Sequence, residues 1–144
     1  MQQEIIDFIN SKEVGVLALE MMDGSPHGAT IHFALSDDKK TFFLETYREY
    51  RKAEALFGRP QSRATLVIGT DESVNQTLQM DGTVQIIKPE DKELYDKVYF
   101  GRFPKKLEKS KDPKFVFFSF VPTWWRYTNF KGANGKLIIT STDK

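Results

Sequence analysis

Residues 45–60, ETYREYRKAEALFGRP, predict a strand that runs directly into a short basic helix. Thr46 and Glu49 have the S/T-x-x-E spacing of a capping box, in which each side chain accepts a hydrogen bond from a backbone N–H group at the helix start. The helix is therefore expected to begin at Thr46. Gly58 and Pro60 are typical of the end of a helix and predict where it stops.

Three cations follow the expected start of this helix and would share one face. They lie at spacing i, i+3 and i+4, opposite an apolar face: Arg48, Arg51 and Lys52 against Ala53, Leu56 and Phe57. Positive charge beside the positive end of a helix is unfavourable unless an anion compensates for it. An Arg fork and a mobile Lys charge suit a phosphate group, so the helix is a candidate phosphate site. The alternative is a solvated basic face, partly paired with the two glutamates of the helix.

The composition fits one domain over residues 1–144 and excludes several kinds of chemistry. With 21 basic and 20 acidic residues, the chain has no overall field that would select nucleic acid or an anionic membrane. It contains no Cys, which excludes disulfides, thiolate catalysis and Cys-ligated metals. No apolar run approaches the roughly 18 residues of a membrane span, and no signal peptide is evident. We therefore expect a cytoplasmic protein without a nucleic-acid or membrane partner.

Alternating and apolar runs on both sides of the basic stretch predict a mainly β fold with helical decoration. An amphipathic helix over residues 2–10 is expected first, with Ile5, Ile6 and Ile9 on one side. Strands are predicted at residues 14–20, 27–35, 41–45, 63–69, 76–87, 115–121 with a continuation at 124–130, and 136–140. The first of these is nearly all apolar, as a strand buried on both faces would be. Six or seven strands at this spacing predict a small antiparallel barrel.

Two further features refine this arrangement. Gly82 inside its strand suggests a bulge or a barrel corner. A second helix is expected from Lys88 to Gly101, with a buried stripe of Leu94, Tyr95 and Val98. The 12 Phe residues are many for this length, and their number favours a homodimer, because a small barrel alone buries so many rings inefficiently.

Taken in order, these segments resemble one known family. VGVLAL, GATIHFAL, FFLETYREYRKAEAL, RATLVIG, the strand with Gly82 and PTWWRY look like the pyridoxamine 5'-phosphate oxidase-like FMN-binding split barrels. The resemblance covers roughly residues 5–130 and is closest to the short, general-stress-protein-like members. It implies a homodimer with two FMN molecules, each in a groove at the subunit interface.

The resemblance also implies candidate residues for the flavin site. The family's phosphate-binding positions match Arg51 and Lys52, with Thr46 at the preceding strand end. Thr30, Ile31 and His32 would border the flavin ring mainly through backbone groups. Polar residues on the fifth strand contact the flavin in this family; Gln79 is the candidate here, with Thr77 as an alternative on the same strand face. Trp124 and Trp125 alternate sides, so one would pack in the core and one would face a groove or a partner. Trp125 is the candidate for the cofactor, and core packing of both is the alternative.

The chain departs from the full pyridoxamine phosphate oxidases at its C-terminal end. Those enzymes close with an Arg-Leu-His segment that grips the substrate, whereas this chain has Gly135-Lys136-Leu137-Ile138 there. Pyridoxamine phosphate oxidation itself is therefore not expected. His27 and His32 point to opposite faces of one strand, so no metal site is predicted. No catalytic triad or carboxylate pair is legible.

Three functions remain open from the sequence. The first is an FMN-dependent oxidoreductase that acts on a small molecule, with a nicotinamide cofactor as electron donor. The second is a non-catalytic flavin-binding or electron-transfer stress protein. The third is a relative that binds haem or a deazaflavin instead of FMN.

Overall fold

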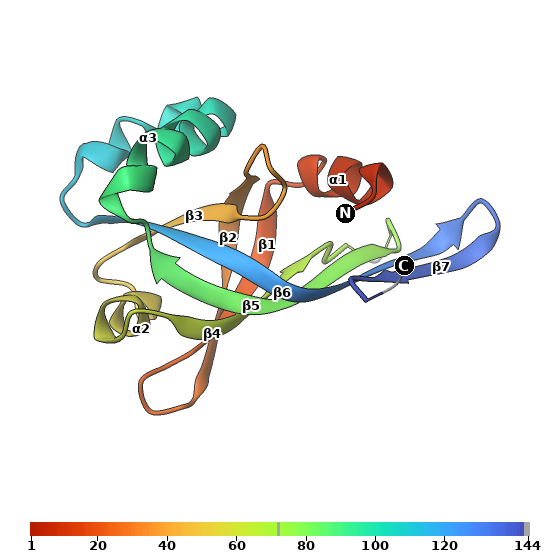
Figure 1. The fold of residues 1–144 in the computed structure, drawn as a ribbon, viewed down its shortest axis with the longest axis horizontal. Coiled ribbons are helices and arrows are strands. Elements are labelled where there is room, and N and C mark those ends of the chain that lie inside the picture. Colours follow the sequence, from red (N-terminus) through yellow and green to blue (C-terminus); the bar gives the residue numbers. More distant parts are fainter. Residues whose placement is uncertain (72, 143–144) are drawn as a thin grey trace.

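The computed structural model describes residues 1–71 and 73–142, whose strands form a single antiparallel sheet (Figure 1). The strands are β1 (Val14–Glu20), β2 (Pro26–Leu35), β3 (Phe42–Tyr47), β4 (Ser62–Ile68), β5 (Gln76–Ile86), β6 (Phe115–Gly132) and β7 (Gly135–Thr140). Their order in the sheet is β3-β2-β1-β4-β5-β6-β7, and β3 also pairs with β6. That additional pairing closes six strands into a barrel, which confirms the predicted split-barrel fold.

β6 links two parts of the sheet. It pairs with β3 over residues 115–120 and with β5 over residues 118–129, and its far end forms a hairpin with β7 that extends away from the barrel (Figure 1). The predicted strand at 115–121 and its predicted continuation at 124–130 form one strand of 18 residues. It bends where the ladder to β5 shifts register between Asp81 and Gly82. A Cβ atom at Gly82 would lie only 2.2 Å from the carbonyl oxygen of Val121, so the predicted bulge needs glycine.

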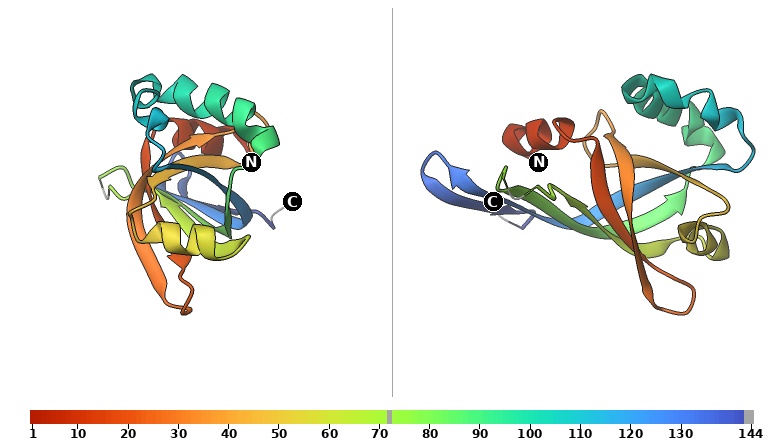
Figure 2. Two further views of the ribbon diagram at one scale, coloured as in Figure 1. Left: turned by 90° about the vertical axis from the view of Figure 1, so that its left-hand side faces the viewer. Right: turned by 180° about the vertical axis from the view of Figure 1, so that it is seen from behind.

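Helices cover the barrel at three places (Figure 2). α1 (Gln3–Asn10) buries one apolar face, formed by Ile5, Ile6, Phe8 and Ile9. α2 (Lys52–Gly58) lies between β3 and β4 in the chain and buries Ala53, Ala55 and Leu56. The third helical segment comprises η1 (Pro89–Asp91), α3 (Lys92–Tyr95), η2 (Asp96–Phe100), η3 (Pro104–Lys106) and η4 (Lys109–Lys111). Among the described residues, no helix has both the length and the apolar character that crossing a membrane requires.

The barrel interior holds the main hydrophobic core. Alternate residues of each strand point inward, and the fully buried ones include Leu17, Phe33, Phe42, Leu66 and Phe118. β1 was expected to be buried on both faces, and that expectation is wrong. Its residues alternate between buried and partly exposed positions, because the outer face of β1 carries no covering helix.

A second core lies outside the barrel, beneath the α3 segment. It contains Ala34, Phe43, Tyr95, Tyr99, Phe100, Phe103 and Phe115. The predicted stripe of Leu94, Tyr95 and Val98 is wrong in part, since Leu94 is 45% exposed. The helix changes at Asp96 from α to π geometry, whose wider turns bring Tyr99 and Phe100 onto the buried side with Tyr95.

Candidate functional site

The segment from β3 to α2 differs from its predicted form. β3 continues to Tyr47 instead of ending at residue 45, because its ladder with β6 continues through Tyr47. α2 begins only at Lys52, with Arg51 as its N-cap residue and no side chain capping its N–H groups. The predicted capping box of Thr46 and Glu49 is therefore wrong. Thr46 is instead a buried strand residue directly before the turn that leads to α2.

The three cations of this segment do not share a helical face as predicted. Arg48 lies in the turn before α2, with its guanidinium 3.9 Å from the centre of the Phe57 ring. Arg51 is exposed at the helix start. Lys52 is buried, only 8% exposed, and its ammonium lies 5.2 Å from the centre of the Tyr50 ring. Arg51 and Lys52 thus remain as the pair at the start of α2, one at the surface and one beneath it.

Lys52 is a buried cation whose charge is not neutralised by an ion pair among the described residues. Burial lowers the pKa of its ammonium, while the negative charge of Glu45 raises it. The Glu45 carboxylate is already paired with Lys106 at 2.8 Å. Nearby in the sequence, the buried Oγ1 of Thr46 has no hydrogen-bond partner. Burying the Lys52 ammonium without an ion pair and the Thr46 hydroxyl without a hydrogen-bond partner costs free energy. An anion with acceptor oxygens would satisfy both groups.

The β2 residues of the predicted site lie on the strand next to the one that carries Thr46. Pairs between β2 and β3 end at Phe33 and Leu44, so the two strands separate beyond that point. Ile31 points into the barrel and is 5% exposed, whereas Thr30 lies on the outer face. The strand separation leaves backbone groups of this part of β2 without partners on β3.

His32 is held in a structural role beneath the third helical segment. Its ring meets the Phe103 ring edge-on, with 5.4 Å between ring centres. Burial lowers the pKa of His32, and the positive charge of Lys106 acts in the same direction. Both effects favour the neutral imidazole over the imidazolium.

The predicted residues of β5 and β6 lie far from Thr46 and Lys52 in one chain. Thr46 pairs with Val116 on β6, and Gln79 pairs with Arg126 on the same strand. Ten positions of β6 separate these two pairs, which is up to roughly 33 Å along the strand at about 3.3 Å per residue. The fold of one chain therefore does not bring Gln79 together with Thr46 at one place.

Trp124 and Trp125 occupy opposite faces of β6. Trp125 packs against the interior core, while Trp124 stacks with Arg126, 5.5 Å from the guanidinium to the ring centre. Thr77 and Gln79 alternate with the buried Leu78 and Met80, so they share the outer face, as predicted. Of the two tryptophans, Trp124 is the one on the same outer face as Gln79.

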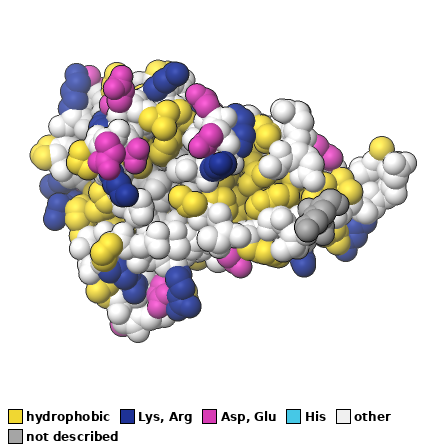
Figure 3. Space-filling view, viewed as in Figure 1, with side chains coloured by type: hydrophobic (Ala, Val, Ile, Leu, Met, Phe, Trp, Pro, Cys, Tyr) yellow, Lys and Arg dark blue, Asp and Glu magenta, His cyan; other side chains and the backbone are white. Residues whose placement is uncertain are grey.

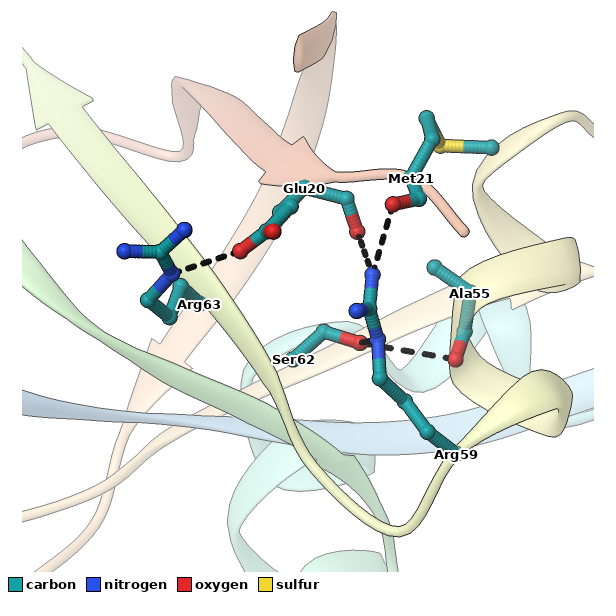
Figure 4. Close-up of polar contacts among 6 residues, drawn as sticks. All are labelled: Glu20, Met21, Ala55, Arg59, Ser62 and Arg63. Atoms are coloured by element: carbon teal, nitrogen blue, oxygen red, sulfur yellow. Dashed lines mark hydrogen bonds and ion pairs between the residues drawn. The ribbon is translucent and has the colours of Figure 1, made fainter. Parts of the chain in front are cut away.

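Arg59 fixes the position of α2, and sequence reasoning missed it. Its guanidinium donates hydrogen bonds to the carbonyl oxygens of Glu20 (2.5 Å) and Met21 (2.8 Å) and to Oγ of Ser62 (2.8 Å), as Figure 4 shows. These contacts fasten the end of α2 to the end of β1, beside an ion pair between Glu20 and Arg63. The partners lie up to 39 residues away in the sequence, so no local pattern signals them.

A comparison with protein-family models agrees with the family resemblance seen in the sequence. A family model described as pyridoxamine 5'-phosphate oxidase matches residues 1–129. The chain belongs to this family. A search of the curated proteins finds no match.

Several solved structures share the fold of this split-barrel protein. A Clostridium acetobutylicum protein related to general stress protein 26 is 18% identical, with a TM-score of 0.66 over 96% of this chain and 92% of that one. The conserved hypothetical protein Rv2991 from Mycobacterium tuberculosis is 26% identical, with a TM-score of 0.65 over 88% and 84%. HutZ, the heme storage protein of Vibrio cholerae, is 20% identical, with a TM-score of 0.66 over 84% and 89%.

Proposed function

We propose that this protein binds FMN and acts as an oxidoreductase on a small molecule, with a nicotinamide cofactor as electron donor. The observation that carries the proposal is Lys52, a buried ammonium without an ion pair, on the segment that the family resemblance assigns to the FMN phosphate. The buried, unpartnered hydroxyl of Thr46 fits the same ligand.

In this proposal each residue of the phosphate site has its own task. Lys52 supplies a fixed positive charge, and the exposed Arg51 supplies a planar fork that closes over the phosphate from the solvent side. Thr46 donates a hydrogen bond from its hydroxyl, and Arg59 keeps α2 in place. Thr30, Ile31 and His32 border the ring through their backbone. When bound, the flavin supplies the hydride or electron transfer itself.

A homodimer is part of the proposal, because Lys52 and Gln79 lie far apart within a single chain. The outer face of β1, β4 and β5 offers a shallow groove of about 660 Å³, lined by small and polar side chains that include Ala18, Thr65, Asp81 and Thr83. We expect light scattering at micromolar concentration to give twice the mass of one chain. A monomer under those conditions would contradict both the dimer and a flavin site built from two chains.

The aromatic residues do not support the dimer in the way the sequence suggested. Most of the rings are buried within one chain, in the interior and beneath α3. The exposed aromatic side chains are Tyr50, Phe57 and Phe130 among the described residues. The dimer proposal therefore depends on the family and on the distance between the two groups of site residues.

Haem is the second candidate ligand, because structural neighbours include HutZ and a heme binding protein from Mycobacterium smegmatis. The absorption spectrum of the purified protein distinguishes the two ligands: we expect flavin bands and no Soret band. We also expect the FMN-loaded protein to oxidise NADH or NADPH. A flavin spectrum without any such turnover would favour the non-catalytic flavin protein.

A further inference from the structure

A separate pocket lies at the end of the barrel between α2 and the third helical segment. Its volume is about 220 Å³. Eight of its eleven lining residues are apolar: Phe57, Ile86, Ile87, Pro89, Pro113, Phe115, Val116 and Phe117. In the left view of Figure 2, α3 lies above and α2 below this end of the barrel. The pocket has a floor of rings and aliphatic side chains that would accept an apolar body.

The remaining lining residues are all cations: Arg48, Lys88 and Lys92. No carboxylate belongs to the lining of this pocket, although the whole chain has 20 acidic residues against 21 basic ones. Lys92 is paired with Asp96 at 2.5 Å and also lies 4.1 Å from the centre of the Phe117 ring. Arg48 and Lys88 have no ion pair in the part of the chain that the structure describes. Figure 3 shows Lys and Arg side chains among hydrophobic ones at this end of the molecule.

The sheet topology places Arg48 and Lys88 on two sides of one strand. β3 and β5 both pair with β6, and both end beside its first residues. The N–H of Arg48 donates to the carbonyl of Lys114 at 2.7 Å, and the N–H of Ile87, next to Lys88, donates to that of Phe117 at 3.0 Å. Two strand spacings, about 10 Å, separate the backbones of β3 and β5 across β6. A small anion between them can be approached by both cations.

We propose that this pocket binds a small anion whose body is a single apolar ring, such as an aromatic phosphate monoester or an aromatic carboxylate. An apolar cavity of about 150 Å³ holds one benzene ring, so a pocket of this size takes one ring and an acid group. The apolar floor receives the ring, and Arg48 and Lys88 receive the charge. The pocket is distinct from the phosphate site of the proposed function, since neither Thr46, Arg51 nor Lys52 lines it.

Phenyl phosphate is a suitable probe, and the variant Arg51→Ala, Lys52→Ala is a suitable background because it removes the other phosphate site. In this background we expect calorimetric titration to show phenyl phosphate binding at least tenfold tighter than inorganic phosphate or benzyl alcohol. Adding Arg48→Gln and Lys88→Gln should weaken phenyl phosphate at least tenfold, since each cation contributes a charge-assisted contact. On titration with phenyl phosphate, the largest amide chemical-shift changes should occur at Ile87, Lys114 and Phe117.

A matched control changes the same number of charges outside the pocket. Lys105→Gln with Lys109→Gln removes two exposed lysines that do not line it, and phenyl phosphate should then bind as before. Three results would overturn the proposal: no binding of phenyl phosphate at millimolar concentration, equal binding of inorganic phosphate, or unchanged binding after the Arg48 and Lys88 substitutions. None of them bears on the proposed FMN site, because all three are measured in a background without the Arg51 and Lys52 side chains.

Discussion

Substitution of Arg51 or Lys52 by Ala should weaken FMN binding by about one to two decades each. A charge-assisted contact to phosphate is worth roughly 1.5–3 kcal/mol, which corresponds to that loss of affinity. The two residues differ in environment: Arg51 is exposed at the N-cap of α2, whereas Lys52 is 8% exposed. We expect the Lys52 substitution to have the larger effect, because a desolvated charge interacts more strongly with a phosphate than an exposed one. Fluorescence titration of the apoprotein with FMN measures both.

Riboflavin is the control ligand, because it lacks the phosphate. It should bind poorly to the unchanged protein and lose little further affinity in either variant, since the deleted contact was never made. Lys109→Ala, at an exposed position outside the site, is the control variant and should bind FMN normally. Equal FMN affinity in the unchanged protein and in the double variant would show that this segment is an ordinary basic surface.

Thermal unfolding of the ligand-free variants separates lost binding from lost folding. The sequence placed Lys52 on a basic helical face, and the structure shows that its side chain is buried. Burial lowers the pKa of Lys52, so its charged form is disfavoured in the folded state without a ligand. Replacing it by Ala removes that unfavourable charge, and the first turn of α2 keeps a strong helix former. Neither variant should therefore unfold at a markedly lower temperature.

Much of the fold could be predicted from the sequence because the strands signal themselves locally. Alternation along β2, glycine at the bulge and turn residues between hairpins are each readable over a few positions. The predicted start of α2 was wrong because a contact between distant parts of the chain overrides the local pattern. Thr46 and Glu49 carry a local helix-start pattern, but the pairing of β3 with β6 joins residues about 70 positions apart and keeps Thr46 in a strand.

The candidate site was predictable only in part. Arg51 and Lys52 were identified from residue type and spacing, whereas the burial of Lys52 depends on how α2 packs. Which tryptophan faces outward follows from the register of β6 with β5, where Trp125 lies opposite the inward-pointing Met80. Arg59 and its carbonyl partners are joined only by the folded chain.

The third helical segment supplies a second prediction with a large effect. Leu94 and Tyr95 are neighbours that the sequence placed together on one buried stripe. In the structure Tyr95 is fully buried at 0% exposure, and its hydroxyl donates a hydrogen bond to the carbonyl oxygen of Leu44 at 2.7 Å. Its ring lies 5.1 Å from that of Tyr99 and 5.3 Å from that of Phe43. Leu94 is 45% exposed.

Tyr95→Ala should therefore lower the free energy of unfolding by about 3–5 kcal/mol, as expected for loss of a large buried aromatic side chain. Leu94→Ala should change it by less than about 0.5 kcal/mol, because it removes an exposed side chain from a helix and introduces the best helix former. Tyr95→Phe keeps the ring and deletes only the hydrogen bond, so its cost should be about 1 kcal/mol. Urea unfolding followed by far-UV circular dichroism measures all three. If Leu94→Ala proved as damaging as Tyr95→Ala, the helix would present the stripe predicted from sequence, and the aromatic cluster beneath it would not be the second core of this fold.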